Sequence, residues 1–399
     1  MASHMDTVEI FELNGTNHSD TNGSSVSTGA PYVIPAYINI VGYLNLYTTP
    51  IIVFFGLVGN VLSFLVFNYT YLHRLSSSTY LAALALTDQI FLTMLLVGPW
   101  LQSLSAETPQ GIDGLCQLQV YFTNVVGFLS VAYVVGFTVE RYVAVCYPLK
   151  RPEFCTSKRA KCVVISLAVF ACVFNSVSLF TNGIRDGYCA PLIEEHMELI
   201  MGFTYIDTVV TLILPTALLI FMNIRIATKV AYFYSNRQVM HTASSTDKLT
   251  VVLMRFHNGV QTVDTGLLTH GGKRLRRTQV KITKMLLLVS TVFLVLNLPS
   301  HSMRVYHLVV TSKREGYSVS PLEWALQQIF QLLYYTNFAI NFALYSLSGQ
   351  NFRKALRRLL GKVKYKANRF FTHVGTTMRR RSVWSRSSPL PDIDTRFTP

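Results

Sequence analysis

Charged side chains are scarce in this chain of 399 residues, of which 14% are Asp, Glu, Lys or Arg and 50% are hydrophobic. A soluble globular domain carries about a quarter charged residues, so this balance disfavours an ordinary soluble enzyme. It also excludes a disordered chain, because disorder requires low hydrophobicity. The composition therefore indicates a membrane protein.

Catalytic and metal-binding motifs are also lacking. The sequence has no glycine-rich phosphate loop, no His-Glu-x-x-His and no Gly-x-Ser-x-Gly motif. Its six cysteines include no Cys-x-x-Cys pair. We therefore predict that the chain is not an enzyme and has no metal centre of the Cys or His type.

The sequence does contain several long apolar windows. A membrane-spanning helix needs about 20 mostly apolar residues. Seven windows meet this length: residues 40–68, 77–104, 115–146, 160–182, 201–233, 279–309 and 322–347. The predicted fold is thus an all-α membrane protein with a seven-helix transmembrane bundle over residues 40–347.

Polar residues interrupt four of these windows, at Asn60, Asp88, Asn297 and Asn341. A polar or charged group in hydrocarbon is costly, so we expect these side chains to face the bundle interior. One stray polar residue per helix would need no partners, but four in four helices favour a shared internal network.

Basic residues are very unevenly placed. Residues 1–49 contain none. Only four basic residues lie in the segments after the second, fourth and sixth windows or at the end of the sixth window: Arg185, Arg304, Lys313 and Arg314. The other 31 lie at the opposite side. Cytoplasmic loops are enriched in Lys and Arg, which predicts an extracellular N-terminus and a cytoplasmic C-terminus at the plasma membrane. The net charge of +15 is explained by this topology rather than by nucleic-acid binding.

The N-terminal segment, residues 1–39, agrees with an extracellular position. It is polar and carries three N-glycosylation sequons, at Asn14, Asn17 and Asn22. It shows no basic region followed by an apolar stretch, so we expect the first window to act as the insertion signal. Cys116 and Cys189 lie on the same predicted outer side, where thiols oxidise, which favours a disulfide between them.

The motifs at the window ends match a known family. The third window ends in Glu140-Arg141-Tyr142, with Leu149 after Pro148. The other landmarks follow in order: Gly59-Asn60, Asp88, Cys116, Pro215, the segment from Phe293 to Pro299, and Asn341 to Tyr345. Over residues 40–360 the chain resembles the rhodopsin-like (class A) G-protein-coupled receptors. The helix 7 form Asn341-Phe-Ala-Leu-Tyr345 resembles invertebrate neuropeptide receptors of the FMRFamide and sex-peptide type.

The resemblance implies an activation switch. Glu140 would hold Arg141 at rest, and release of Arg141 would let it contact a heterotrimeric G protein as helix 6 moves outward. The alternative is a simple interfacial ion pair. The acid that can clasp this Arg from helix 6 is here Gln279, which predicts a weaker lock and raised basal activity. The other residues assigned to the switch and to coupling are Tyr142, Leu149, Phe293, Asn297, Pro299, Asn341 and Tyr345.

The family register also places Asp88, Ser130, Asn337 and Asn341 together in mid-bundle. One carboxylate with neutral oxygens suits an allosteric Na⁺ ion. The alternative is a protonated Asp88 bonded to the Asn side chains without an ion. No other cofactor is expected.

The ligand is expected on the outer side. Thr123 and Tyr335 stand where the family has its amine-binding Asp and retinal-binding Lys, which disfavours an amine or retinal ligand. Carboxylates there outnumber the four basic residues, so a short basic or amidated neuropeptide is favoured. The alternatives are a small aromatic or amino-acid-like ligand and, in another class, a secondary transporter. The predicted ligand-binding residues are Trp100, Gln119, Thr123, Asp207, His301, Arg304, Gln331 and Tyr335.

The C-terminal part begins with an amphipathic pattern at residues 348–360. Phe352, Ala355, Leu356, Leu359 and Leu360 share one face, and Arg or Lys residues take the other. This predicts a short helix 8 on the lipid bilayer. Residues 361–399 are predicted to form a flexible cytoplasmic tail. Ser382 follows three Arg residues and suits a basophilic kinase, and phosphates added by receptor kinases to the cluster of Ser382, Ser385, Ser387 and Ser388 would suit arrestin. The alternative is that this serine-rich tail is only a linker.

Overall fold

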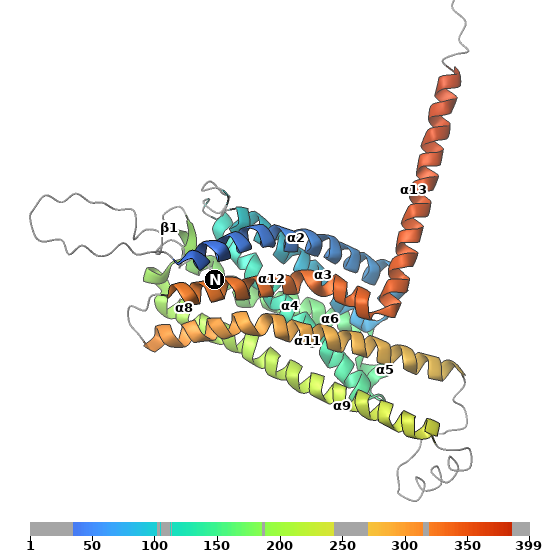
Figure 1. Ribbon diagram of the computed structural model, residues 1–399, viewed down its shortest axis with the longest axis horizontal. Coiled ribbons are helices and arrows are strands. Elements are labelled where there is room, and N and C mark those ends of the chain that lie inside the picture. The colour runs from blue at the N-terminus through green and yellow to red at the C-terminus, as the bar shows by residue number, and fades with distance from the viewer. Residues whose placement is uncertain are drawn as a thin grey trace, which may run out of the picture.

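The computed structural model describes residues 35–101, 104, 112, 114–185, 188–242, 270–313 and 319–384. The sequons at Asn14, Asn17 and Asn22 and the last tail serines lie outside these residues. The described part is almost entirely helical, with long helices packed side by side along one direction (Figure 1). The predicted all-α seven-helix fold is confirmed.

The seven long helical segments lie on the seven predicted windows. They are α2 (Ala36–Tyr69), α3 (Ser76–Leu95), α4 (Leu115–Cys146), α6 (Ser157–Phe174), α8 (Ile193–Asp207) joined through η5 (Thr208–Ile213) to α9 (Leu214–Thr242), α11 (His270–Lys313) and α12 (Pro321–Ser348). Short elements complete the bundle: η1 (Tyr71–Arg74), η2 (Leu96–Trp100), α5 (Arg151–Phe154), η4 (Asn175–Val177) and α7 (Ser178–Thr181).

Six of these segments are long and apolar enough to cross a membrane: Ala36–Tyr69, Ser76–Trp100, Leu115–Cys146, Ser157–Thr181, His196–Tyr232 and Thr283–His307. The remaining segment is α12, whose 28 residues include several Gln and Asn side chains that lower its hydropathy. It packs against α2 and α11 and buries residues along its length, including Phe338 and Tyr345. It is the seventh helix of the bundle because its polar side chains face inward rather than toward lipid.

α4 lies at the centre of the bundle, in contact with α3, α6, α9 and α11. The main core gathers around Phe137, Phe293 and Tyr345, all buried. Close packing of α2 on α12 depends on Gly59, where a Cβ atom would lie 2.8 Å from Cβ of Phe342. Small residues permit such close approach of membrane helices.

Prolines mark the breaks in helical geometry. Pro215 follows the π-helical turn η5, and Pro99 lies inside the π-helical turn η2. Pro299 lies within α11. Each proline lacks a backbone N–H and removes one helical hydrogen bond, so these are the positions where the helices bend most easily.

At one end of the bundle, the disulfide end, β1 (Asn182–Arg185) and β2 (Tyr188–Pro191) form an antiparallel hairpin with Gly183 opposite Ala190. At the other end, the Arg141 end, α13 (Gln350–Trp384) projects across the direction of the bundle helices (Figure 1). This helix was predicted to end at residue 360 before a flexible tail. That prediction is wrong for residues 361–384, which continue α13 to Trp384 and contain no proline that would end the helix.

Candidate functional site

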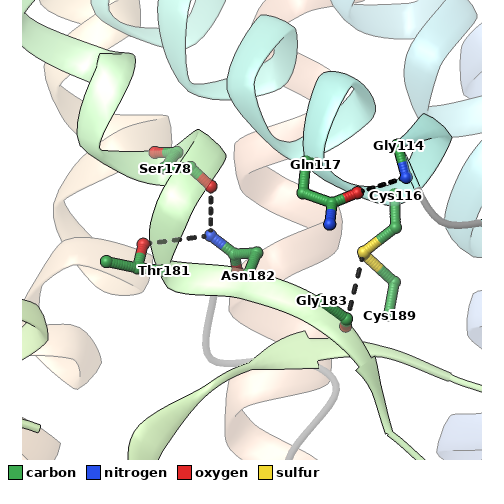
Figure 2. Close-up of a disulfide and its surroundings, with 8 residues drawn as sticks. All are labelled: Gly114, Cys116, Gln117, Ser178, Thr181, Asn182, Gly183 and Cys189. Carbon is green, nitrogen blue, oxygen red and sulfur yellow. Dashed lines mark hydrogen bonds between the residues drawn. A yellow bond between two sulfur atoms is a disulfide. The ribbon is translucent and has the colours of Figure 1, made fainter. Parts of the chain in front are cut away.

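The disulfide end is organised by the predicted bond between Cys116 and Cys189, whose Cα atoms lie 5.5 Å apart. It ties β2 to the first turn of α4, as Figure 2 shows. Behind the hairpin, the buried Asn182 side chain donates to the carbonyl oxygen of Ser178 at 2.8 Å and to Oγ1 of Thr181 at 3.3 Å. The hairpin is thus held over the bundle by both a covalent bond and a buried amide.

Beneath this end, α8 and α11 are joined by an ion pair between Asp207 and Arg304. The Asp207 side chain is 13% exposed and that of Arg304 is 33% exposed. His301 lies one helical turn before Arg304, and its ring meets that of Tyr334 edge-on with centroids 6.0 Å apart. Three predicted ligand-binding residues therefore form one group.

This pair corrects the electrostatic argument made from the sequence. Asp207 was predicted to attract a cationic ligand, but its charge is already balanced within the chain by Arg304. Glu323 is also engaged: it caps α12 by accepting from the Ser320 backbone N–H at 2.9 Å, and it accepts from the Tyr306 hydroxyl at 2.7 Å. Any ligand must therefore compete with existing bonds at these carboxylates.

The other predicted ligand residues are spread around the bundle. Trp100 donates its indole N–H to the carbonyl oxygen of Leu46 in α2 at 2.9 Å, and Gln119 donates to that of Met94 at 3.3 Å. Gln331 accepts from the Ser300 hydroxyl at 3.5 Å, which links α12 to α11. Tyr335 is buried beside Phe91, and Thr123 is half-buried on α4. The structure links Gln331 to α11 and places Tyr335 against α3, whereas Trp100 and Gln119 bond the neighbouring helices α2 and α3.

In mid-bundle the structure brings together three of the four residues predicted for the sodium site. Asp88 is fully buried and accepts from the Ser130 hydroxyl at 3.0 Å and from the Asn341 amide at 2.7 Å. Asn337 takes part through its main-chain carbonyl, which lies 3.5 Å from Nδ2 of Asn341. Nearby on α2, Asn60 donates to the carbonyl oxygen of Phe338 in α12 at 2.9 Å.

The predicted shared network does not include Asn297. Its amide donates at 2.6 Å to the carbonyl oxygen of Phe293, four residues earlier in the same helix. An Asn amide one turn above a carbonyl can donate to it within the same helix, so the Asn297 N–H does not reach another helix. Its side-chain oxygen has no hydrogen-bond partner among the described residues.

At the Arg141 end, the predicted partner of Arg141 is confirmed: its guanidinium lies 3.0 Å from Oε1 of Glu140, and both residues are buried. Two serines at the start of α3 complete the arrangement. Ser77 accepts from Arg141 at 3.2 Å, and Ser76 donates to Glu140. The sequence did not predict these serine contacts. The side chain of Gln279 lies outside the described residues.

The residues near the ion pair of Glu140 and Arg141 differ in their exposure to solvent. Leu149 is 88% exposed and therefore available to a partner. Tyr142 packs with its ring centroid 6.1 Å from that of Phe221 on α9. Cys155 is half-buried behind Glu140, and this burial raises the pKa of its thiol above the ordinary value. The thiol is therefore protonated at neutral pH.

Two contacts hold the Arg141 end of α11 against its neighbours. The Ser290 hydroxyl of α11 donates to the side-chain oxygen of Asn223 on α9 at 2.9 Å, and both residues are buried. Met285, one turn nearer the Arg141 end, faces Gly349: a Cβ atom at Gly349 would lie 2.6 Å from the Met285 sulfur. The sequence did not predict the bond between Ser290 and Asn223.

Among the described residues, no group of three or more His, Cys, Asp and Glu side chains could hold a metal ion.

Comparisons with known proteins agree with this picture. A family model described as "7 transmembrane receptor (rhodopsin family)" matches residues 59–345. The chain is 25% identical over 327 residues to the thyrotropin-releasing hormone receptor of Gallus gallus, covering 76% of this chain and 75% of that receptor. It is 24% identical over 315 residues to the neuromedin U receptor homolog nmur-2 of Caenorhabditis elegans, covering 77% and 76%. It is 23% identical over 363 residues to neurotensin receptor type 1 of Rattus norvegicus, covering 85% and 79%.

Proposed function

Because the chain belongs to the rhodopsin family of seven-transmembrane receptors, we propose that it binds a short extracellular peptide and activates a heterotrimeric G protein at the plasma membrane. The receptor class makes it a multi-pass membrane protein and not an enzyme. The peptide class is supported by its relatives, whose names are those of receptors for thyrotropin-releasing hormone, neuromedin U and neurotensin.

One observation carries the mechanism: α11 is bonded at both ends of the bundle. Arg304 joins it to Asp207 near the disulfide end, and Ser290 joins it to Asn223 near the Arg141 end. A ligand that exchanges with the first bond changes the position that α11 prefers. With Pro299 between the two contacts as a flexible point, the change loosens the second.

Loosening of α11 would release the lock on Arg141. In the structure Arg141 is only 4% exposed and bound to Glu140 and Ser77, so no partner can reach it. Outward movement of α11 would uncover this end. Exposed Leu149 would then complete the surface offered to the G protein.

The ligand chemistry follows from the paired charges. A basic or amidated peptide can donate to Asp207 only by displacing Arg304, or it can bind beside the intact pair through Gln331 and His301. A small aromatic or amino-acid-like ligand is the second candidate, because the His301 and Tyr334 rings lie in contact close to the charged pair of Arg304 and Asp207.

The test is a G-protein activation assay in cells that express the chain, challenged with Phe-Met-Arg-Phe-amide, the same peptide with a free carboxylate, and free aromatic amino acids. A response to peptide that is lost in Arg141→Ala at equal surface level supports the proposal. Response to amino acids alone selects the second candidate. No response and no basal signal despite surface expression contradicts the G-protein mechanism and favours a transporter.

We also propose that Asp88, Ser130 and Asn341 hold a Na⁺ ion that stabilises the arrangement seen here. The residues fit the ion, since a carboxylate has about four acceptor positions and Asp88 uses two of them. Na⁺ should raise the melting temperature of the purified receptor more than K⁺ does, and Asp88→Asn should abolish the difference. Equal melting temperatures in both salts for the unmodified chain would favour a protonated Asp88 without an ion.

Receptor kinases and arrestin remain proposed partners of the tail. Ser382 lies in α13, whereas the serines after Trp384 lie outside the described residues.

A further inference from the structure

α13 starts from a fixed anchor on the bundle. Phe352 and Ala355 are buried, and the Phe352 ring packs between Phe67 and Tyr345 with centroid distances of 5.4 and 5.5 Å. The Tyr71 hydroxyl donates to the carbonyl oxygen of Asn351 at 3.0 Å. The first turn of α13 therefore has a defined rotation relative to the bundle.

Beyond this anchor the same helix face continues without a partner in the described structure. Leu360 is 50% exposed and Val363 is 58% exposed. The apolar stripe that begins at Phe352 continues in the sequence at helical spacing as far as Met378. Its members are Phe352, Leu356, Leu359, Val363, Ala367, Phe370, Val374 and Met378. At 1.5 Å per residue this stripe is about 40 Å long.

The charge of this helix has one sign. Residues 350–384 contain eleven Lys or Arg and no Asp or Glu. Most of these residues lie on the sides of the helix away from the stripe, as Lys354, Arg357 and Lys364 do. Lys366 lies at the edge of the stripe, where a long side chain can extend to the polar side. A basic amphipathic helix of this kind binds either an anionic membrane surface or an acidic protein.

The position of α13 decides between these partners. It begins one residue after the membrane-spanning helix α12 ends at Ser348, so it starts at the bilayer surface. It then runs across the direction of the spanning helices rather than along it, which places it parallel to the membrane plane (Figure 1). We propose that residues 361–378 form a membrane-bound arm that lies on the anionic leaflet, with the stripe in the lipid and the basic residues at the headgroups.

The arm is distinct from the short interfacial helix expected at residues 348–360, and it does not depend on which ligand or G protein the receptor uses. It gives the receptor a recognition surface for acidic lipids about 27 Å long in the plane of the membrane. Binding would weaken as salt screens the headgroup charge, because the attraction acts within a Debye length.

Hydrogen exchange of the full-length receptor in lipid nanodiscs tests this inference. We expect amides of residues 361–378 to exchange at least about tenfold more slowly in discs of phosphatidylcholine with phosphatidylserine than in phosphatidylcholine alone. High salt should remove the difference. Equal exchange in both discs would overturn the proposal, as would protection that appears only when a Ca²⁺-loaded acidic sensor protein is added.

Two matched variants separate the apolar face from the total charge. Val363→Glu places a carboxylate in the stripe, and Tyr365→Glu places the same charge on the opposite face. Both positions are exposed, at 58% and 69%, so neither change disturbs the bundle. Val363→Glu should lose the protection and Tyr365→Glu should keep most of it, at unchanged melting temperature of the bundle. Equal behaviour of the two variants would contradict the proposed orientation.

Discussion

Ser290 and Asn223 form a buried hydrogen bond between α11 and α9. Removing the Ser290 hydroxyl leaves the Asn223 oxygen without its donor. A buried neutral hydrogen bond contributes about 1 kcal/mol, so Ser290→Ala should shift the closed-to-open ratio about fivefold. We expect raised ligand-independent G-protein signalling, measured at equal surface expression.

Ser302→Ala is the matched control. Ser302 is exposed on the same helix and donates only to the carbonyl oxygen of Leu298 in its own helix, at 2.7 Å. Its removal should leave basal signalling unchanged. If both serine variants signal like the unmodified chain, the bond does not hold α11 in place.

Asp207 and Arg304 should behave as a coupled pair. Either Asp207→Asn or Arg304→Gln leaves a partly buried charge alone, which we expect to lower stability by about 1 kcal/mol. The exchange Asp207→Arg with Arg304→Asp should recover at least half of that loss, since the two charges meet again. Thermal unfolding of the purified variants measures the coupling. A double variant less stable than either single one would show that their surroundings, not their mutual attraction, fix these side chains.

This pair also shows where sequence reasoning ends at the residue scale. Both residues were predicted to line the ligand site, but Asp207 was treated as a free carboxylate. Pairing depends on the rotation of α8 and α11 about their axes, which the lengths of apolar windows do not specify. The same limit applies to Asn297, whose local bond to Phe293 depends on side-chain conformation. Contacts set by order along one helix, such as Glu140 with Arg141, were predictable.

At the scale of elements, Gly349 joins α12 to α13, and its lack of a side chain lets Met285 of α11 pack close to this junction. A Cβ atom at Gly349 would lie 2.5 Å from the carbonyl oxygen of Tyr345 and 2.6 Å from the Met285 sulfur. Gly349→Ala must therefore shift the backbone at the junction of α12 and α13 and displace the Met285 side chain of α11. We expect a loss of about 1–3 kcal/mol of stability, as for overpacked cores, together with raised basal signalling.

Gly361→Ala provides the comparison for this change. Nothing lies within 4 Å of a Cβ atom at Gly361, which sits in the middle of α13. The substitution should be neutral or slightly stabilising, because Ala is the better helix former by up to about 1 kcal/mol. Melting temperature and basal signal together show whether the contact at Gly349 affects signalling. If Gly349→Ala lowers stability without raising the basal signal, the contact is structural only.

The elements themselves were largely predictable because each window of apolar residues must span the bilayer. The seven windows match the seven long helical segments, with ends that differ by several residues where helices project beyond the apolar part, as α11 does toward His270. The end of α13 was predicted wrongly because the charge and serine content of residues 361–399 is typical of a flexible tail, although apolar residues continue at helical spacing as far as Met378. The serine contacts of α3 with α4 were missed because Ser76 and Ser77 carry no signal of their own in the sequence.

At the scale of the whole molecule, α11 connects the ion pair of Arg304 near the disulfide end with the hydrogen bond of Ser290 near the Arg141 end. Its bonds to Asp207 and to Asn223 involve the same neighbour, the continuous segment of α8, η5 and α9. This segment contains the π-helical turn just before Pro215, and α11 contains Pro299. Both helices thus have a weak point between their two contacts. Such a pair can adopt two discrete packings, and a ligand shifts the balance only by its differential affinity for them.

The orientation of the molecule in the membrane gives the last prediction. The topology predicted from the sequence assigns four of the 35 basic residues to the same side as the disulfide and the sequons, and the structure places α13, with its eleven basic residues, at the Arg141 end. The asymmetry of Lys and Arg should place the disulfide end outside. Glycosidase treatment of the receptor from intact mammalian cells should therefore lower its apparent mass, and replacing Asn14, Asn17 and Asn22 by Gln should remove the effect. An epitope placed after Pro399 should bind antibody only once cells are permeabilised. Antibody binding to intact cells would reverse the topology and with it the assignment of the Asp207 region to the ligand and of Arg141 to the G protein.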